Sequence, residues 1–435
     1  MEKTQYAEMK QALKIYQDGM GLINYLAFLV FLFLLPMPWH WVQPVWVVWL
    51  IAWFLEGRWL KRDNFRFSKK LIPQLLILAF VAWEALSLIW TDNLQVGQRD
   101  LSKHIYFVAV LIVSLFGVNE RYDTGAMKTA VCLGSVVAVI GYSMISMWLM
   151  SDGIRELWPN VTDIFPQFGQ FDYVGGEHIN FIKHHLYMAL VILAAICFSP
   201  DIYKTFKRVM RKEYAIAGIV VCDLILCYGI IASTCRIAMF LLPVMFVICM
   251  LVYYDGKYRK GIMVGSLVIA VILIGTLLVR SERLRTSFDD IYLDYNEQRQ
   301  AYIEAYDNAR PYIWYTVIKH IGDYGVTGKG LGSEEDTMNK YYEEDGQHLC
   351  RLMSFNAHST YLSTWIQLGP IALVLLISIL VVMPFCYPIE QRKRVAMICL
   401  LIAAVMLTET ILWRMSGLYI IFALMILSKP YKEHE

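Results

Sequence analysis

The sequence predicts an all-α polytopic membrane protein with about twelve transmembrane helices. Of its 435 residues, 58% are hydrophobic and only 17% are charged, which leaves too little polar surface for a soluble protein of this size. Apolar runs of about 20 residues recur along the chain, and that length crosses a hydrocarbon core of roughly 30 Å. The runs are too long and too uniformly apolar for barrel strands, and a spanning segment has to satisfy its own backbone hydrogen bonds, so helices are favoured.

Apolar segments make up most of the chain. The first begins near Gly21 and is followed directly by further apolar segments, so we interpret it as a transmembrane helix and not as a cleaved signal peptide. The predicted spans lie near residues 21–37, 43–56, 71–90, 104–118, 127–149, 180–198, 214–232, 236–254, 261–279, 359–383, 395–410 and 413–428.

The distribution of lysine and arginine predicts the orientation. These residues cluster in four loops, which twelve spans would place on the same side of the membrane as both termini. Cytoplasmic loops carry an excess of Lys and Arg, so this side is predicted to be cytoplasmic. Because the basic residues are confined to short loops, nucleic-acid binding is not supported. The clusters consist of Arg58, Lys61, Arg62, Arg66, Lys69 and Lys70; Lys204, Lys207, Arg208, Arg211 and Lys212; Lys257, Arg259 and Lys260; and Arg392, Lys393 and Arg394.

A long polar segment interrupts the apolar pattern on the outer side. We predict a membrane domain of nine helices in residues 1–280, an outer loop subdomain in residues 281–358, and three further membrane helices in residues 359–435. Apolar residues at helical spacing between Pro311 and Gly322 predict an amphipathic helix on the membrane surface or on the outer ends of the spans. The stretch 294–309 is also predicted to be helical. The apolar positions are Ile313, Trp314, Val317, Ile318 and Ile321.

Three polar residues near the outer ends of spans are candidates for chemistry. His358 lies at the start of a span, where a neutral imidazole can accept a proton from an attacking hydroxyl, or can be a structural histidine bonded at an interface. Arg236 begins another span and could bind phosphate through paired donors, or extend toward lipid headgroups. Arg310 opens the predicted amphipathic helix and could hold a second phosphate oxygen, or remain a solvated charge.

Other polar groups lie near the same side. The glycine-rich run at 322–332, which includes Lys329, could present backbone N–H groups to an anion or form a flexible turn. Glu84 and Asp223 lie inside spans, where charges are costly and are usually paired or functional. Lys183 and His184 enter a span on the outer side and could add positive charge to a cavity.

No pattern in the sequence is diagnostic of a metal site. The acidic clusters at 334–336 and 343–345 are interpreted as a solvated face, with a divalent-ion site as the less favoured alternative. No C-x-x-C pair occurs among the nine cysteines. Cys235 and Cys350 both fall on the outer side, so a disulfide between them is an open possibility.

Three segments together resemble the O-antigen ligase and O-antigen polymerase superfamily of bacterial envelope enzymes. The first is LSLIW at 86–90, at the outer end of the third predicted span. The second is STCR at 233–236, which resembles a serine–arginine element that opens a span in that family. The third runs from Arg310 and Trp314 through the glycine-rich run to AHSTYL at 357–362 and LGPI at 368–371. Ser359 and Pro370 depart from the family's usual His-Asn and Gly-aliphatic-Gly patterns.

The resemblance implies a lipid-dependent glycosyltransferase (GT-C-like) fold in the bacterial inner membrane, with cytoplasmic termini and a periplasmic active site. The implied donor is a glycan on undecaprenyl pyrophosphate, used without a metal or other cofactor. Arg236 and Arg310 would match the family's pyrophosphate-binding arginines, and His358 its candidate base. Two guanidiniums could stabilise the departing pyrophosphate in place of a metal. Accessory candidates are Lys329, Glu84, Lys183 and His184.

Several functions remain open at this point. The acceptor could be lipid A core, as for a ligase, a second lipid-linked glycan, as for a polymerase of O-antigen or capsule repeats, or a protein hydroxyl. The ligase and polymerase hypotheses are favoured, because no further acceptor-binding domain is predicted after the last span. A transporter or flippase of lipid-linked sugars fits twelve spans, but the chain lacks an internal repeat. A non-catalytic component of an envelope polysaccharide complex is the third class.

Overall fold

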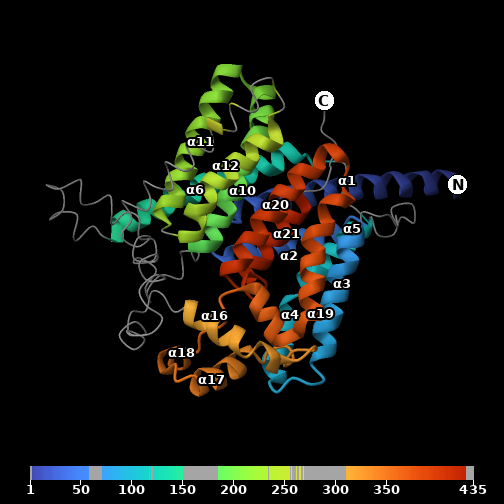
Figure 1. Ribbon diagram of the computed structural model, residues 1–435. Coiled ribbons are helices and arrows are strands. Elements are labelled where there is room, and N and C mark those ends of the chain that lie inside the picture. The colour runs from blue at the N-terminus through green and yellow to red at the C-terminus, as the bar shows by residue number, and fades with distance from the viewer. Residues whose placement is uncertain are drawn as a thin grey trace. The chain divides into compact units, whose positions relative to one another are not determined.

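The computed structural model is helical throughout the residues that it describes (Figure 1). These are residues 2–57, 71–116, 121–149, 185–233, 235–254 and 310–427, with single positions at 118 and between 256 and 268. No β-strand occurs in these ranges. The chain divides into two compact units, one of residues 1–68, 112–249 and 423–435, and the other of residues 69–111 and 250–422.

Helices coincide with all but one of the predicted spans. The exception is the span at 261–279, which lies almost entirely outside the described residues, as does the predicted helix at 294–309. Among the described helices, six are long and apolar enough to cross a membrane, and this supports a polytopic membrane protein. These six segments are Leu13–Leu34, Thr124–Ile145, His185–Val209, Lys212–Ala232, Arg236–Tyr253 and Thr360–Cys386.

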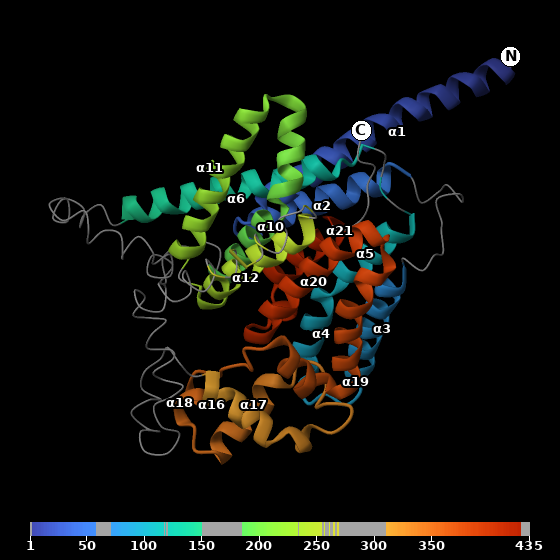
Figure 2. The same cartoon turned by 45° about the horizontal axis from the view of Figure 1, so that its top comes forward.

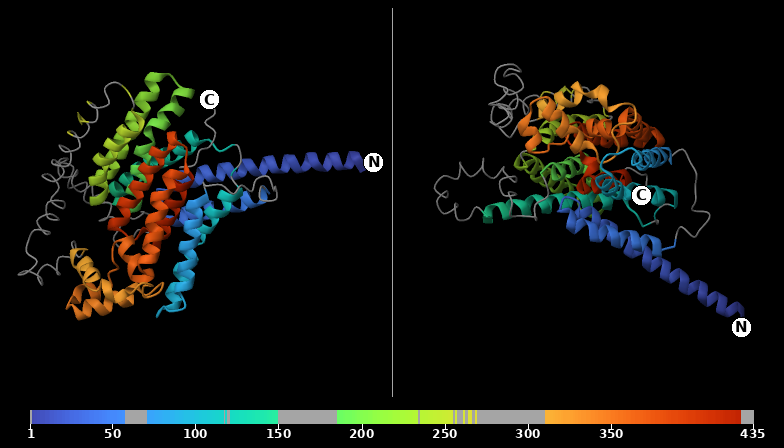
Figure 3. Two further views of the ribbon diagram at one scale, coloured as in Figure 1. Left: turned by 45° about the vertical axis from the view of Figure 1, so that its right-hand side comes forward. Right: turned by 90° about the horizontal axis from the view of Figure 1, so that it is seen from below.

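The first unit is built mainly from apolar helices that pack along one another. Helix α1 (Glu2–Leu34) packs against α2 (Trp39–Leu55) and α6 (Thr124–Leu149), and α6 packs against α10 (His185–Val209) and α11 (Lys212–Ala232) (Figure 3). Most of α12 (Arg236–Tyr253) also belongs to this unit.

Charged groups inside the first unit are paired. The Ser199 hydroxyl donates a hydrogen bond of 2.5 Å to the Asp223 carboxylate, so the prediction that this intramembrane acid would find a partner is confirmed. Lys128 and Asp201 form a buried ion pair with an N–O distance of 2.5 Å. Such pairing is what makes charge tolerable among apolar helices.

The second unit contains α3 (Ile72–Ser87), α4 (Leu94–Lys103), α19 (Thr360–Val382), α20 (Ile389–Thr408) and most of α21 (Met415–Leu427). Helices α3 and α19 lie side by side (Figures 1 and 3). The span predicted at 359–383 is not one continuous helix, because Gly369 has φ 72° and ψ −178°, and Pro370 follows it. The indole N–H of Trp83 donates to the Leu368 carbonyl over 2.9 Å, and so satisfies an acceptor at this break.

The predicted outer loop subdomain includes α16 (Arg310–Lys319), α17 (Glu334–Glu344) and α18 (His348–Leu352), which lie together in Figure 2. The prediction of a helix between Pro311 and Gly322 is confirmed. Its inner face is buried in a hydrophobic cluster, whereas Ile318 on its outer face is 59% exposed. The buried members of the cluster are Ile313, Val317, Tyr324, Met338, Tyr341, Tyr342, Cys350, Ala357 and Ile366.

Candidate active site

The loop that precedes α19 holds His358 in an unusual backbone conformation. His358 has φ 43°, which is uncommon for a residue other than glycine. The preceding peptide is fixed by Trp314 of α16, whose indole N–H donates to the Ala357 carbonyl over 2.9 Å. The His358 backbone N–H donates to the Asn356 side chain over 2.9 Å, and the Phe355 ring packs edge-on against the imidazole. The packing of α16 therefore determines where this histidine lies.

The imidazole of His358 is partly exposed and lies near a carboxylate. Its Nδ1 atom is 4.0 Å from a carboxylate oxygen of Glu409, which is within ion-pair range but too long for a hydrogen bond. The side chain of His358 is 28% exposed and that of Glu409 is 10% exposed. Nδ1 is buried and has no hydrogen-bond partner among the described residues. Nδ1 of His358 is thus available to bond to Glu409 after a small movement of either side chain, or to bond to a bound molecule.

Glu409 lies just after α20 and is tied to the start of α19. The Thr360 backbone N–H and hydroxyl both donate to the Glu409 carbonyl, over 3.1 and 2.6 Å, and the Thr410 N–H donates to the Glu409 carboxylate over 3.3 Å. This residue was not singled out in the sequence. The only feature of the sequence that could have pointed to Glu409 is its position as an acidic residue between two apolar segments.

Glu334 corrects the interpretation of the first acidic cluster as a solvated face. One oxygen of its carboxylate accepts hydrogen bonds from the Ala357 backbone N–H (2.8 Å) and the Ser363 hydroxyl (2.5 Å), and the other accepts from the Gln367 amide (3.1 Å). Burial raises the pKa of Glu334 above its ordinary value, although the hydrogen bonds from Ala357 and Ser363 and the nearby His358 oppose the shift. Glu335, by contrast, is exposed, as the sequence predicts.

Arg310 lies at the first position of α16, within the same unit as His358. Its Nε atom is buried and has no hydrogen-bond partner among the described residues. A buried guanidinium N–H without a partner is costly unless a ligand or water satisfies it, so this donor is suited to an anionic ligand.

Arg236 lies at the first position of α12, in the first unit, and is partly buried there. Its approach to His358 and Arg310 stays a prediction. Lys183 and His184 lie outside the described residues.

The end of the glycine-rich run, residues 328–332, is a closely packed turn and not a flexible one. The backbone N–H groups of Lys329 and Gly330 donate to the Ile366 and Gln367 carbonyls, over 2.9 and 2.8 Å. The next two N–H groups donate to the Ser87 hydroxyl (3.1 Å) and to the Gln367 side chain (2.8 Å). All four donors from 329 to 332 are therefore used inside the protein, which excludes them from anion binding. The Lys329 side chain stays a candidate, because it is partly exposed.

A buried pair joins Glu84 of α3 to His104, directly after α4. Their N–O distance is 2.6 Å, and both side chains are fully buried. The other imidazole nitrogen of His104 bonds to the Leu412 carbonyl over 3.0 Å, and the Trp413 ring packs against it. Glu84 is therefore paired, and the pair links α3 and α4 to the segment after α20, while its accessory role at the donor site stays a prediction.

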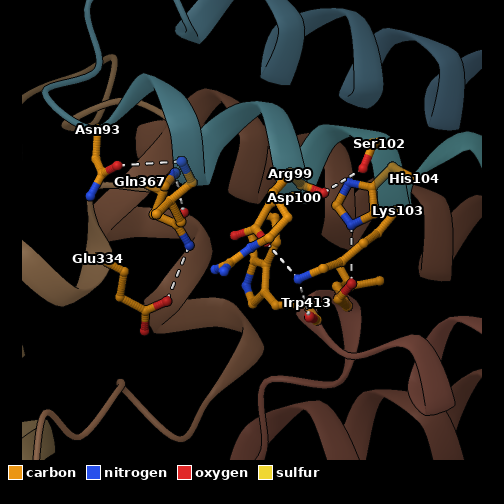
Figure 4. Close-up of polar contacts among 12 residues, drawn as sticks. Asn93, Arg99, Asp100, Ser102, Lys103, His104, Glu334, Gln367 and Trp413 are labelled. Carbon is orange, nitrogen blue, oxygen red and sulfur yellow. Dashed lines mark hydrogen bonds and ion pairs between the residues drawn. The ribbon is translucent and has the colours of Figure 1, made fainter.

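One side of α4 adds polar groups that the sequence analysis did not select (Figure 4). The Lys103 ammonium lies 2.6 Å from the Asp100 carboxylate and 3.3 Å from the Trp413 carbonyl. Asn93 caps α4 by accepting from the Val96 N–H, and its amide donates to Asp336 of α17 over 2.9 Å. The feature of the sequence that could have pointed to these residues is a polar stretch on the predicted outer side, with charges at helical spacing.

No group of side chains in the described part of the chain is arranged to hold a metal ion. Cys235 and Cys350 belong to different units, so a disulfide between them stays a prediction. In the second acidic cluster, Asp345 is 1% exposed and accepts from Lys319, from His320 (3.3 Å) and from Thr316 (3.1 Å). The interpretation of that cluster as a solvated face is therefore wrong for Asp345.

Replacement of Asp345 by asparagine is expected to lower the free energy of unfolding at neutral pH by about 1–2 kcal/mol, because a charged acceptor of several donors is lost. Burial alone would raise the pKa of Asp345, but the bonds from Lys319, His320 and Thr316 lower it below its ordinary value. The native pKa is therefore below the unfolded one, so this stabilisation is present above an unfolded pKa of about 3.9 and is lost as the pH falls through the native pKa.

Thermal unfolding in detergent between pH 7 and pH 3 would measure this effect. The matched control is Glu344→Gln. The Glu344 side chain is 47% exposed, and its ion pair with Lys340, at 3.8 Å, should contribute little to stability. An Asp345→Asn variant that unfolds at the wild-type temperature at pH 7 would contradict the assignment.

Comparison with known families identifies the central part of the chain. The family described as O-Antigen ligase matches residues 221–377, a segment that contains Arg236, Arg310, Glu334 and His358. No curated protein matches the chain. The predicted resemblance is thereby confirmed for residues 221–377, which are similar to the O-antigen ligase family.

Proposed function

We propose that the protein is a membrane glycosyltransferase that moves a glycan from undecaprenyl pyrophosphate to an acceptor hydroxyl, with lipid A core as the favoured acceptor. The observation that carries the proposal is the placement of His358, a partly exposed imidazole with a nearby carboxylate, inside the segment that matches the O-antigen ligase family. Arg310, whose buried Nε has no partner in the described residues, lies in the same segment. The proposal includes twelve spans in a GT-C-like fold.

The proposed reaction is a single displacement at the anomeric carbon. His358 takes the proton of the acceptor hydroxyl, whose oxygen forms the new glycosidic bond with inversion of configuration. The bond from the anomeric carbon to the pyrophosphate oxygen breaks, and its electron pair leaves with undecaprenyl pyrophosphate. Arg236 and Arg310 stabilise the charge on that leaving group. Glu409, 4.0 Å from the imidazole, stabilises the imidazolium that forms.

The same proposal includes the cellular location of the reaction, its accessory residues and its cofactor requirement. The protein lies in the bacterial inner membrane, with both termini in the cytoplasm and His358 on the periplasmic face. Lys329, Glu84, Lys183 and His184 are accessory to the donor site. The reaction uses no metal and no other cofactor, as the resemblance implies.

Transfer by the purified protein in nanodiscs tests the proposal. The donor is a glycan on undecaprenyl pyrophosphate, the added acceptor is lipid A core, and a parallel reaction contains EDTA. Glycan on lipid A core, in equal yield with EDTA, would establish a metal-independent ligase. Longer lipid-linked chains without a lipid A product would establish the polymerase of the same family. Movement of the donor across vesicles without any new glycosidic bond would favour a transporter and overturn the proposal.

Replacement of Arg310 by alanine is expected to lower kcat/KM for the lipid-linked donor by about 10–10²-fold, because a charged hydrogen bond to pyrophosphate is worth about 1.5–3 kcal/mol. Arg310→Lys should recover only part of the loss, since an ammonium cannot bind bidentately. The matched control is Arg351→Ala in α18, where the side chain is 48% exposed and pairs with Glu343. Equal kcat/KM in the Arg310→Ala and Arg351→Ala variants would contradict the assignment.

A further inference from the structure

We infer that Glu334 is a positioning residue for His358, which it holds in place through the peptide that precedes the histidine. This inference rests on the proposed function, in which His358 is the base. Glu334 is the first residue of α17, in sequence 24 positions before His358, and nothing in its local sequence distinguishes it from the exposed Glu335 beside it.

Two side chains bond to the backbone groups of Ala357. Glu334 accepts from its N–H over 2.8 Å, and Trp314 donates to its carbonyl over 2.9 Å. Both polar groups of Ala357 are thus fixed by side chains from two different helices of the outer subdomain, α16 and α17. Ala357 itself is fully buried. His358 directly follows this peptide, so the position of the His358 Cα atom is fixed as well.

The backbone conformation of His358 also depends on its surroundings. Its φ of 43° is uncommon for a residue with a side chain, and such a conformation persists only where the surroundings determine it. The bond from Glu334 to Ala357 is one of the contacts that maintain it, and the bond from the His358 N–H to Asn356 is another. Loss of the first should let the chain relax and move the imidazole away from Glu409.

A carboxylate is needed at position 334 because both of its oxygens face hydrogen-bond donors. The Gln367 side-chain oxygen accepts from the Gly332 N–H over 2.8 Å, so its amide nitrogen faces Glu334 (Figure 4). The other Glu334 oxygen receives two donors, from Ala357 and Ser363. Both oxygens of residue 334 therefore face donors. A glutamine there would turn its own amide N–H₂ toward the N–H₂ of Gln367.

The same contact offers a compensating exchange. In a Glu334→Gln, Gln367→Glu variant, the amide of residue 334 can donate to the carboxylate of residue 367, which still accepts from the Gly332 N–H. The Ala357 and Ser363 donors keep their acceptor. The hydrogen-bond pattern is restored, and the negative charge moves to α19. Asp100 and His358, the charged groups whose fields reach Glu334, are unchanged in this variant.

The experiment compares transfer by wild type, Glu334→Gln, the double exchange, and Glu335→Gln as the matched control. We expect Glu334→Gln to lower kcat by at least about 10-fold with KM for the donor within about twofold, since a misplaced base affects the chemical step. The double exchange should recover most of kcat, and Glu335→Gln should equal wild type. Wild-type kcat in folded Glu334→Gln, or no recovery in the double exchange, would overturn the inference.

A second measurement does not depend on activity. Diethyl pyrocarbonate modifies neutral, accessible imidazoles, and mass spectrometry of the peptide that contains His358 gives the rate of modification. We expect Glu334→Gln to change this rate several-fold and the double exchange to return it to the wild-type value. An unchanged rate in Glu334→Gln would overturn the inference. Absence of transfer in wild type, or full transfer in a His358→Ala variant, would instead overturn the proposed function, so the two failures are distinguishable.

Discussion

Replacement of His358 by alanine is expected to lower glycan transfer by about 10²–10⁴-fold at saturating donor, the range that a general base contributes. The acceptor hydroxyl would then have to lose its proton to water. The variant should fold normally, because the imidazole is partly exposed and its Nδ1 has no hydrogen-bond partner among the described residues. KM for the donor should change little, since the donor's pyrophosphate is assigned to Arg236 and Arg310.

The matched control for this variant is His348→Ala. His348 is an exposed histidine at the start of α18 in the same subdomain, so its replacement should leave transfer unchanged. Initial rates with labelled lipid-linked glycan, normalised to folded protein from size-exclusion chromatography, would measure the difference. A His358→Ala enzyme that keeps more than about a tenth of the wild-type rate would exclude a role as general base.

Replacement of Gly369 by alanine is expected to destabilise the second unit by about 3–5 kcal/mol. With φ 72° and ψ −178°, Gly369 occupies a backbone region that is essentially restricted to glycine. A Cβ there would also lie 2.2 Å from the Val326 carbonyl oxygen and 2.7 Å from the Gly328 nitrogen. Both neighbours are backbone atoms that cannot move aside without disrupting the glycine-rich turn. The turn should therefore separate from α19.

Two other glycines of the loop separate strain from steric overlap. Gly325 has φ 71° but no atom within 4 Å of a Cβ, so Gly325→Ala should cost only the backbone strain of about 1–3 kcal/mol. Gly322 has neither feature, and Gly322→Ala should change stability by less than about 0.5 kcal/mol. Unfolding temperatures in detergent should fall in the order Gly322, Gly325, Gly369. A Gly369→Ala variant as stable as Gly322→Ala would show that the break in α19 is not maintained by this packing.

The helices and the family resemblance could be predicted from the sequence. Apolar runs and the spacing of Ile313 and Val317 are local patterns, and periodicity of 3.6 residues identifies a helix wherever it later packs. The resemblance depended on three segments, and the match over residues 221–377 contains the two that include Arg236, Arg310 and His358, whereas LSLIW at 86–90 lies outside it. The break at Gly369-Pro370 was not predicted as an interruption of the span, although both residues were noted.

The partners of the polar residues could not be predicted, because they come from distant parts of the chain. Glu334 meets Ala357 from 23 residues away, Glu84 meets His104 from 20 away, and Trp83 meets Leu368 from 285 away. An acidic residue in a run of three acidic residues has the same local sequence whether it is solvated or buried. The glycine-rich run likewise has the same letters whether its N–H groups are free or bonded to α19.

The sequence by itself therefore determined that this is a helical membrane protein whose residues 221–377, which include His358 and Arg310, resemble the O-antigen ligase family. Only the tertiary structure decided that Glu334 and Trp314 hold the peptide before His358, and that Glu409 lies beside the imidazole. The physical reason is that hydropathy and helical periodicity act over a few residues. Hydrogen bonds of buried polar groups depend on which surfaces the folded chain brings together.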